Sequence, residues 1–372
     1  MSLTRLTILH LEASPGWGGQ EIRILREAEG MRSRGHRVIF VVMQGGALAK
    51  EARNEGFTAY EMGFHKRSWP LTLLRLIALI RKERVSLINT HSSLDSWIGG
   101  IAGRLCKVPI VRTRHLSTPN KPGLNSHLLY GRLADFVVTT CASILPGISE
   151  RSGKPLSQMR SVPTGVNPAR MEVKEEDGRA FRKSIGVAEN DFLVGTACFM
   201  RSWKGLHDFL DAAVLLRSEP RLRWVIIGGG HQETYRKRAS ELGLDGIVHF
   251  TGHLTNPIPA LKGLDAFALL STAHEGVSQA ILQAAYLEKP LIATATGGLC
   301  EVCMDGKTGI QVPPNSPDRV ADAVISLMND QEIRKFFGSQ ARELVLSHFT
   351  FEKTIDEMED IYRNLNGASP IC

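Results

Sequence analysis

The chain has 372 residues, of which 43% are hydrophobic and 22% charged, so it has the composition of an ordinary globular protein and the length of two domains. Its net charge of +7 is uneven, since residues 1–170 hold 24 Lys and Arg against 11 Asp and Glu, and this basic half predicts an anionic partner. The sequence has neither an apolar run of the roughly 20 residues that span a membrane nor a signal peptide, so we expect a cytoplasmic protein.

The first half alternates short β-branched runs with stretches of helical periodicity. The pattern is typical of a parallel sheet covered by helices on both faces, and it predicts a first domain over residues 1–170. A basic amphipathic stretch at 65–84 is expected to be a sheet-covering helix, with binding to an anionic membrane as the alternative. Strands are predicted at 5–11, 36–43, 85–91, 109–115 and 135–140.

A polar stretch at 167–186 interrupts this rhythm, which then begins again. It predicts a second doubly wound domain over 171–350, followed by a helix at 351–365 that packs back on the first domain. Open parallel sheets bind ligands at the carboxyl ends of their strands, so two facing sheets would enclose a cleft. The strands of this domain are predicted at 192–199, 222–229, 247–252, 265–271 and 290–296.

The stretch "AHEGVSQAILQAAYLEKP" at 273–290 predicts a turn that leads into a helix. The unpaired amides at a helix N-terminus bind phosphate, and we expect Gly276, Val277 and Ser278 to present theirs. Glu275 and Gln283 are eight residues apart, about 12 Å along a helix axis, so they could bond the sugar and the ribose of a sugar nucleotide. An ordinary helix with one buried glutamine fits the spacing as well, and this alternative stays open.

The longer stretch "EGVSQAILQAAYLEKPLIATATGGLCEVCMDGKTG" resembles the signature of the retaining glycosyltransferases of family 4, which have the GT-B fold. That signature has Glu-Gly, a second Glu eight positions after the first, an Ala-rich helix ending in Pro, and Gly-Gly. Gln283 replaces the second Glu, but its carboxamide can still bond ribose hydroxyls. The resemblance implies two Rossmann-like domains facing across a cleft, an acceptor-side domain at 1–170 and a nucleotide-sugar-binding domain at 171–350.

Further stretches carry the resemblance over nearly the whole chain. "MRSWKGLHDFLDAA" resembles the loop that grips the donor diphosphate, which implies that Lys204 and Arg201 stabilise the leaving group. "GWGGQEIRILREAEGMRSRGHRV" resembles the first loop and helix of the family, in which a glycine pair packs against the diphosphate. The remaining donor contacts implied by the resemblance are Gly18, Gly19, Gly229, Gly252, His253 and Leu254.

Two histidines, His91 and His115, end predicted strands of the first domain and are expected at the carboxyl edge of its sheet. In the family, a histidine that corresponds to His115 commonly bonds the donor sugar near the reacting carbon. The resulting catalytic set is His115, Glu275, Lys204 and Arg201. His91 is expected to bind the acceptor or to orient the site. Arg112 and Arg114 flank the strand end and would receive an anionic acceptor, unless they are ordinary surface charges.

The resemblance implies transfer of a hexose from a nucleoside diphosphate sugar, with UDP-hexose favoured, to a glycan or glycolipid of the bacterial envelope, such as polysaccharide or lipopolysaccharide. The chain has no D-x-D motif, and GT-B enzymes generally dispense with the metal that this motif holds, so no metal or other cofactor is expected. Peripheral contact with the inner face of an anionic membrane is a further expectation. Nucleic acid is not expected, because no nucleic-acid-binding module is recognised.

Two alternatives stay open at this point. A nucleotide-sugar epimerase or hydrolase of the same fold would turn over the donor without an acceptor. A catalytically silent sugar-nucleotide-binding protein would bind the donor and make no product, and the change to Gln283 speaks for it.

Overall fold

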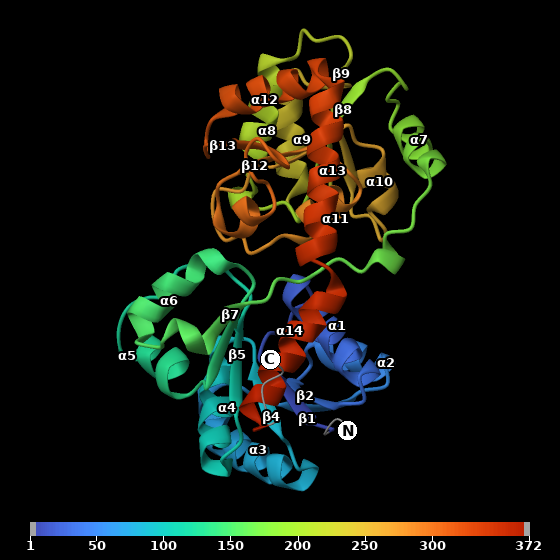
Figure 1. Ribbon diagram of the computed structural model, residues 1–372. Coiled ribbons are helices and arrows are strands. Elements are labelled where there is room, and N and C mark those ends of the chain that lie inside the picture. Colours follow the sequence, from blue (N-terminus) through green and yellow to red (C-terminus); the bar gives the residue numbers. More distant parts are fainter. Residues whose placement is uncertain (1–4, 368–372) are drawn as a thin grey trace. The chain divides into compact units, whose positions relative to one another are not determined.

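The computed structural model describes residues 5–367 and divides into two compact units (Figure 1). Unit 1 runs to Pro163 and resumes at Glu352, and unit 2 comprises Thr164–Phe351. This division differs from the predicted boundary between 170 and 171. Residues 164–170 belong to unit 2 because the Val166 amide donates to the Phe349 carbonyl and the Phe351 amide donates to the Val166 carbonyl, both at 2.8 Å.

Unit 1 contains a seven-stranded parallel sheet with the order β3-β2-β1-β4-β5-β6-β7. All five predicted strands are present. The two that were not predicted, β3 and β7, lie at the edges, where strands are short or half-exposed and lack a continuous apolar run. The strands are β1 (Thr7–Glu12), β2 (Arg37–Met43), β3 (Thr58–Met62), β4 (Leu87–Thr90), β5 (Ile110–Arg114), β6 (Phe136–Thr139) and β7 (Met159–Ser161).

The last helix of the chain, α14, packs on unit 1, where the Asn89 side-chain amide donates to the Tyr362 hydroxyl at 2.7 Å. The helices of unit 1 are α1 (Gly19–Ser33), α2 (Ala47–Asn54), α3 (Trp69–Glu83), α4 (Ser93–Cys106), α5 (Leu124–Ser126), α6 (Leu145–Ser152) and α14 (Phe351–Leu365). A π-helical segment at His127–Arg132 and short 3-10 turns at Lys66–Ser68, Ala142–Ile144 and Leu156–Gln158 complete the unit.

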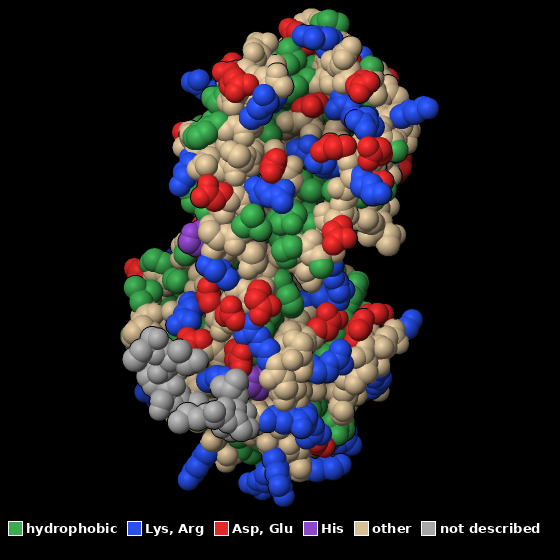
Figure 2. Space-filling view, turned by 45° about the vertical axis from the view of Figure 1, so that its right-hand side comes forward, with side chains coloured by type: hydrophobic (Ala, Val, Ile, Leu, Met, Phe, Trp, Pro, Cys, Tyr) green, Lys and Arg blue, Asp and Glu red, His purple; other side chains and the backbone are tan. Residues whose placement is uncertain are grey.

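Helix α3 is the basic amphipathic segment that the sequence singled out. It begins next to Pro70, whose missing amide proton costs nothing in a first helical turn, and ends at Arg84 in the left-handed conformation (φ 51°). Leu76 and Ile80 pack on the sheet core, as expected for a sheet-covering helix. Figure 2 shows Lys and Arg side chains that project from the end of unit 1 where α3 lies.

Unit 2 contains a six-stranded parallel sheet with the order β10-β9-β8-β11-β12-β13. The five predicted strands are again present, and the one that was not predicted, β13, is a half-exposed edge strand of four residues. Two parallel-sheet α/β domains therefore stand as the sequence predicted. The strands are β8 (Phe192–Ala197), β9 (Leu222–Ile227), β10 (Val248–Gly252), β11 (Ala266–Leu269), β12 (Leu291–Thr294) and β13 (Gly309–Val312).

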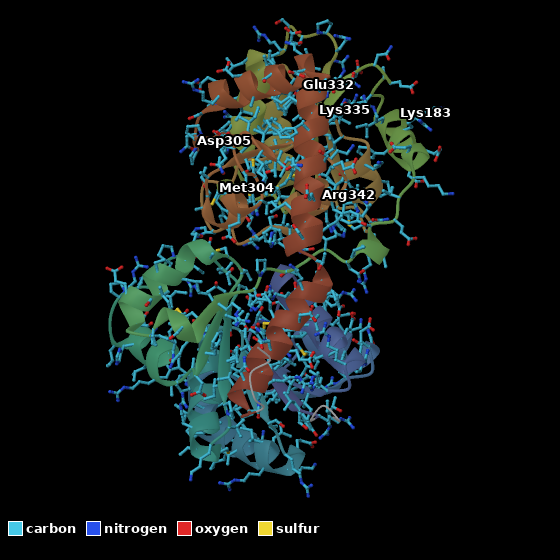
Figure 3. The ribbon with its side chains drawn as sticks, in the orientation of Figure 1. Lys183, Met304, Asp305, Glu332, Lys335 and Arg342 are labelled. Atoms are coloured by element: carbon cyan, nitrogen blue, oxygen red, sulfur yellow. The ribbon has the colours of Figure 1, made fainter. Side chains whose placement is uncertain are left out.

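The long helix α13 covers one side of unit 2 and is tied to α11. Arg342, labelled on α13 in Figure 3, lies 3.3 Å from the Glu288 carboxylate and 4.9 Å from the centre of the Tyr286 ring. The helices of unit 2 are α7 (Glu175–Ser184), α8 (Leu206–Leu215), α9 (Gln232–Glu241), α10 (Ile258–Lys262), α11 (Gln279–Tyr286), α12 (Pro317–Asn329) and α13 (Gln331–His348), with 3-10 turns at Pro168–Arg170, Ser202–Lys204 and Gly297–Glu301.

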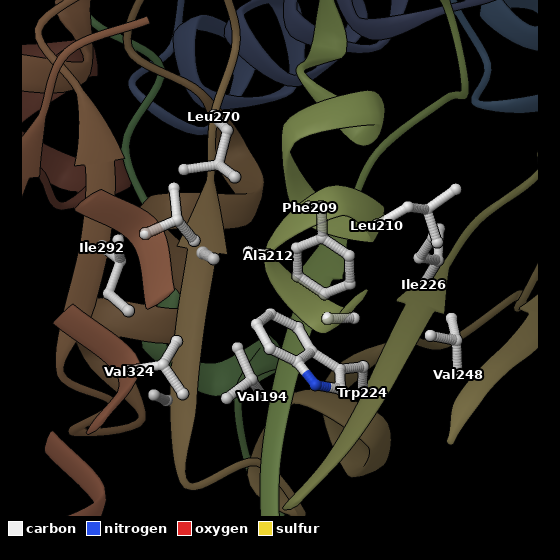
Figure 4. Close-up of a cluster of buried hydrophobic side chains, with 14 of the residues drawn as sticks. Val194, Phe209, Leu210, Ala212, Trp224, Ile226, Val248, Leu270, Ile292 and Val324 are labelled. Carbon is white, nitrogen blue, oxygen red and sulfur yellow. The ribbon is translucent and has the colours of Figure 1, made fainter. Parts of the chain in front are cut away.

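The main core of unit 2 lies between the sheet and α8 (Figure 4). Phe209 of α8 meets the fully buried Trp224 of β9 edge to face, with ring centres 4.9 Å apart and planes at 86°. Val194 of β8 and Leu270, just after β11, join the same cluster. This packing fixes α8 against the sheet, and with it the loop between β8 and α8.

Candidate functional site

A buried carboxylate and a lysine meet at the carboxyl edge of the sheet of unit 2. Lys204 ends the 3-10 turn after β8, and Glu275 lies in the loop after β11. The Lys204 ammonium donates to a Glu275 oxygen that also accepts from the Ser271 hydroxyl at 2.6 Å. Glu275 is 5% exposed, so these donors replace hydrogen bonds to water that burial removes. The sequence predicted both charged residues but not Ser271.

Gly205 makes this approach possible. Its φ of 66° lies in the left-handed region, which suits glycine, and a Cβ atom there would overlap the carbonyl of Leu270. The Thr272 amide also donates to the Trp203 carbonyl at 2.8 Å, which holds the two loops together. Lys204 is thus placed beside Glu275 by backbone contacts on both of its sides.

Arg201, the second predicted cation, stands exposed in the same loop. Its guanidinium lies 5.2 Å from the ring centre of Phe199 and 5.2 Å from that of Trp203. Within residues 5–367 it forms no ion pair, so its charge is available to a ligand. The Phe199 ring thus supports the Arg201 guanidinium on one side.

Three of the predicted donor-binding residues come together at the ends of β9 and β10. The Gly228 amide donates to the Gly252 carbonyl at 3.0 Å, and a Cβ on Gly229 would lie 3.5 Å from the Cβ of His253. The Met200 amide donates to the Gly229 carbonyl at 2.8 Å, which joins this edge to the loop of Arg201 and Lys204. Leu254 follows, half-buried.

The prediction of a helix opening at Glu275 needs correction. Helix α11 begins at Gln279, with Ser278 as its N-cap. His274 adopts the left-handed conformation (φ 61°), so a continuous right-handed helix cannot include it. Gly276 and Val277 therefore precede the helix, and its free amides are those of residues 278–281. The 12 Å helical spacing from Glu275 to Gln283 does not apply. Gln283 is half-buried, and its carboxamide forms no hydrogen bond in the described part of the chain.

In unit 1, three histidines form a chain, in which the rings of His10 and His91 are nearly parallel (13°) and those of His91 and His115 are tilted by 38°. Nδ1 of His91, after β4, lies 3.0 Å from Nε2 of His115, after β5, and Nε2 of His91 lies 2.9 Å from Nδ1 of His10 in β1. Burial lowers the pKa of His10 below its usual value and lowers the pKa of His91 and of His115 further still, so all three rings are neutral at pH 7. His10 was not predicted, although a histidine inside an apolar strand was a signal.

The two arginines predicted to receive an anionic acceptor are engaged inside unit 1. The Arg112 side chain is buried and donates to the Ser92 carbonyl and the Ser96 hydroxyl. Arg114 donates to the Tyr130 hydroxyl and to the carbonyl of residue 118. Both arginines lie in β5, near the strand end where they were predicted, but both guanidinium groups donate hydrogen bonds within unit 1.

The predicted glycine pair opens α1. Gly18 is the N-cap, and its amide donates to the Glu21 carboxylate at 2.8 Å. A Cβ on Gly19 would meet nothing within 4 Å, so the backbone there is open to a ligand. Over the described residues, 5–367, no group of three His, Cys, Asp or Glu side chains is placed to hold a metal ion.

Two family models match the chain. Residues 17–170 match the model of "Glycosyltransferase Family 4", and residues 177–344 match the model of "Glycosyl transferases group 1". The two matches together span most of both units and include His91, His115 and the Lys204–Glu275 pair, whereas His10 lies before the first match.

The chain is also similar to curated proteins and to solved structures. The chain is 25% identical over 296 residues to N-acetyl-alpha-D-glucosaminyl L-malate synthase of Bacillus anthracis, covering 77% of each chain. It is 24% identical over 306 residues to the capsular polysaccharide biosynthesis glycosyltransferase CapM of Staphylococcus aureus, covering 78% of this chain and 80% of CapM. Alr3699/HepE of Anabaena, solved with UDP, has a TM-score of 0.86 at 21% identity over 96% of this chain and 100% of its own.

Proposed function

Because the chain belongs to glycosyltransferase family 4 and has the GT-B fold, we propose that it transfers a hexose from a UDP-hexose to a hydroxyl group of a glycan or glycolipid, with retention of configuration. The observation that carries the proposal is the pair formed by Lys204 and Glu275 at the carboxyl edge of the sheet of unit 2. Ligands of open α/β sheets bind at this edge.

In the proposed reaction, the bond between the anomeric carbon and the diphosphate oxygen breaks while a bond to the acceptor oxygen forms. The departing phosphate takes the proton of the acceptor hydroxyl. Lys204 and Arg201 stabilise the negative charge that grows on the diphosphate, and they supply the charge that a metal would otherwise bring. Glu275 and His115 accept hydrogen bonds from hydroxyls of the donor sugar.

The choice of a UDP-hexose rests on the Anabaena neighbour, which was solved with UDP and with UDP-glucose. The choice of a bacterial envelope polysaccharide or lipopolysaccharide as acceptor rests on relatives such as CapM and on the basic first half of the chain. His91 contributes to the acceptor side in this proposal.

A thermal-shift screen with UDP-, GDP- and ADP-sugars tests the donor. A UDP-hexose at about a hundred times its Kd is expected to stabilise the protein by about 2.7 kcal/mol. For a domain of this size, that corresponds to a rise in Tm of about 5 °C or more. A rise with a GDP- or ADP-sugar and none with a UDP-hexose would contradict the choice of base.

The same preparation separates the two alternatives. Release of UDP without an acceptor, at a rate that an acceptor does not raise, identifies a hydrolase, and conversion of the donor to its stereoisomer without net release of UDP identifies an epimerase. Binding of the donor with no product from any envelope glycan identifies a silent binding protein, which Gln283 favours because the family has a glutamate there. Acceptor-dependent release of UDP together with an elongated glycan is the result that the proposal requires.

We also propose that α3 makes peripheral contact with an anionic membrane. Leu71 and Leu74 are 52% and 66% exposed, and Arg67, Arg75 and Arg81 are exposed beside them. In residues 5–367, no helix has the length and apolar character needed to span a membrane. Two exposed leucines flanked by arginines fit shallow insertion of one helix face.

Replacing both leucines of this patch by serine is expected to weaken binding to vesicles that contain anionic lipid by about tenfold or more per leucine, because each loses the burial of its side chain. Cosedimentation with vesicles measures the effect. Leu346→Ser serves as the control, since Leu346 is a 45% exposed leucine on α13 of unit 2. Unchanged binding of the double variant would overturn the proposed contact.

A further inference from the structure

Behind the histidine chain of unit 1 lies a buried carboxylate that the proposed chemistry does not use. Glu27 of α1 is 1% exposed, and it accepts a hydrogen bond from the Tyr362 hydroxyl of α14. That hydroxyl in turn accepts from the side-chain amide of Asn89 at 2.7 Å. The Asn89 amide is oriented by the hydroxyl of Thr113, which donates to its oxygen at 2.8 Å.

These contacts fix where the protons are. Burial raises the pKa of Tyr362 well above its ordinary value, so the phenol keeps its proton and donates it to Glu27. The Asn89 amide also points a hydrogen toward Glu27, with 3.5 Å between nitrogen and oxygen. Both neighbours offer hydrogens to the same Glu27 oxygen, so Glu27 is the acceptor of this network.

The Glu27 carboxylate faces the inner end of the histidine chain. Nε2 of His10 lies 3.9 Å from a Glu27 oxygen and has no hydrogen-bond partner within residues 5–367. A ring nitrogen lone pair aimed at a carboxylate is repelled, whereas an N–H group is attracted, and the low dielectric of the interior strengthens this preference. His10 therefore carries its proton on Nε2, and its Nδ1 is an acceptor.

The order of protons then follows ring by ring, since each contact between two nitrogens needs one donor and one acceptor. Because Nδ1 of His10 accepts, Nε2 of His91 donates to it. The other nitrogen of a neutral His91, Nδ1, must then accept from Nε2 of His115. Nδ1 of His115 is left with a lone pair, and it has no partner in the described residues, in a side chain that is only half-buried.

We propose that Glu27 is a positioning residue that sets the tautomers of His10, His91 and His115, so that His115 presents a hydrogen-bond acceptor at Nδ1 to a hydroxyl of the donor sugar. The assignment of that hydroxyl rests on the proposed function, whereas the order of protons rests on unit 1 alone. The reverse order would place an N–H at the same point, and a sugar hydroxyl would then have to accept instead of donate.

Imidazole ¹⁵N shifts of the wild-type protein, labelled at the histidine ring nitrogens, test the order of protons without any substrate. Signals are assigned by replacing each of the three histidines singly with glutamine. We expect all three rings to be neutral at pH 7, with the proton on Nε2. A proton on Nδ1 of His115, or an imidazolium at His10, His91 or His115, overturns the proposal.

Glu27→Gln tests the cause. Its amide can turn its hydrogens toward His10, so His10 can accept at Nε2, and the order reverses along the chain. The His115 signals are expected to move to the Nδ1–H form or to a mixture. Glu29→Gln is the matched control, because Glu29 lies two residues further on α1 and pairs with Arg26 at the surface at 2.7 Å. Unchanged tautomers in Glu27→Gln overturn the proposal, and if this variant does not fold, the wild-type spectrum still decides.

Activity with the donor found in the thermal-shift screen tests the link to the sugar. Glu27→Gln is expected to lower kcat/KM by about tenfold, the loss of one hydrogen bond, and Glu29→Gln to leave it unchanged. Reversed tautomers with full activity overturn the role of His115 and leave the proton order standing. A wild-type protein that turns over no nucleotide sugar refutes the proposed function, while the spectrum is judged separately.

Discussion

Replacing Lys204 with alanine is expected to lower kcat by about 10² to 10³, with a smaller change in the KM for the donor. In the proposed reaction the charge on the diphosphate grows as the glycosidic bond breaks, so the lysine stabilises the transition state more than the bound donor. Steady-state kinetics of UDP release measures the effect. Lys237→Ala, at an 80% exposed lysine of α9, is the control and should keep full activity.

The same variant leaves the buried Glu275 without its cation. Removing one partner of a buried ion pair costs about 3 to 5 kcal/mol, and the upper part of that range is not expected because Lys204 is 18% exposed. A second change, Glu275→Gln, made in the Lys204→Ala background, should therefore recover part of the lost Tm. It should not recover activity. A double variant that regains turnover would mean that the lysine acts through stability alone.

Much of the fold could be predicted because its central strands are apolar and β-branched. Runs such as residues 36–43 and 222–229 are buried in the sheets, and burial is what demands that composition. The edge strands β3, β7 and β13 have no such demand, since at least half of the positions in each face the surface or are half-buried. These edge strands form because they pair with a neighbouring strand, and the local sequence pattern does not predict that pairing.

The site could be predicted only in part, for a similar reason. Lys204 and Glu275 stand beside glycine-rich turns after strands, and parallel strands bring such turns to one edge. Where a side chain points is decided by its neighbours, and Arg112 turned inward to the Ser92 carbonyl instead of outward. Glu27 and Tyr362 are 335 residues apart in the sequence, so the local sequence around neither residue predicts their hydrogen bond.

Gly205→Ala is expected to be among the most damaging single changes in unit 2. The left-handed conformation alone costs an alanine about 1 to 2 kcal/mol. The added Cβ would also overlap the Leu270 carbonyl, which directly follows β11, a strand held by neighbours on both sides. We expect a total loss above about 4 kcal/mol. For a domain of this size, that is a fall in Tm of about 8 °C or more.

Gly243→Ala separates the two contributions. Gly243 has a similar φ (70°), but a Cβ there meets nothing within 4 Å, so only the conformational cost of about 1 to 2 kcal/mol remains. Its activity should be unchanged, whereas Gly205→Ala must push the loop away from Leu270 and draw Lys204 away from Glu275. Tm should therefore fall in both variants, whereas activity should fall only in Gly205→Ala. Equal shifts in Tm for both would mean that the approach to Leu270 does not hold Lys204 in place.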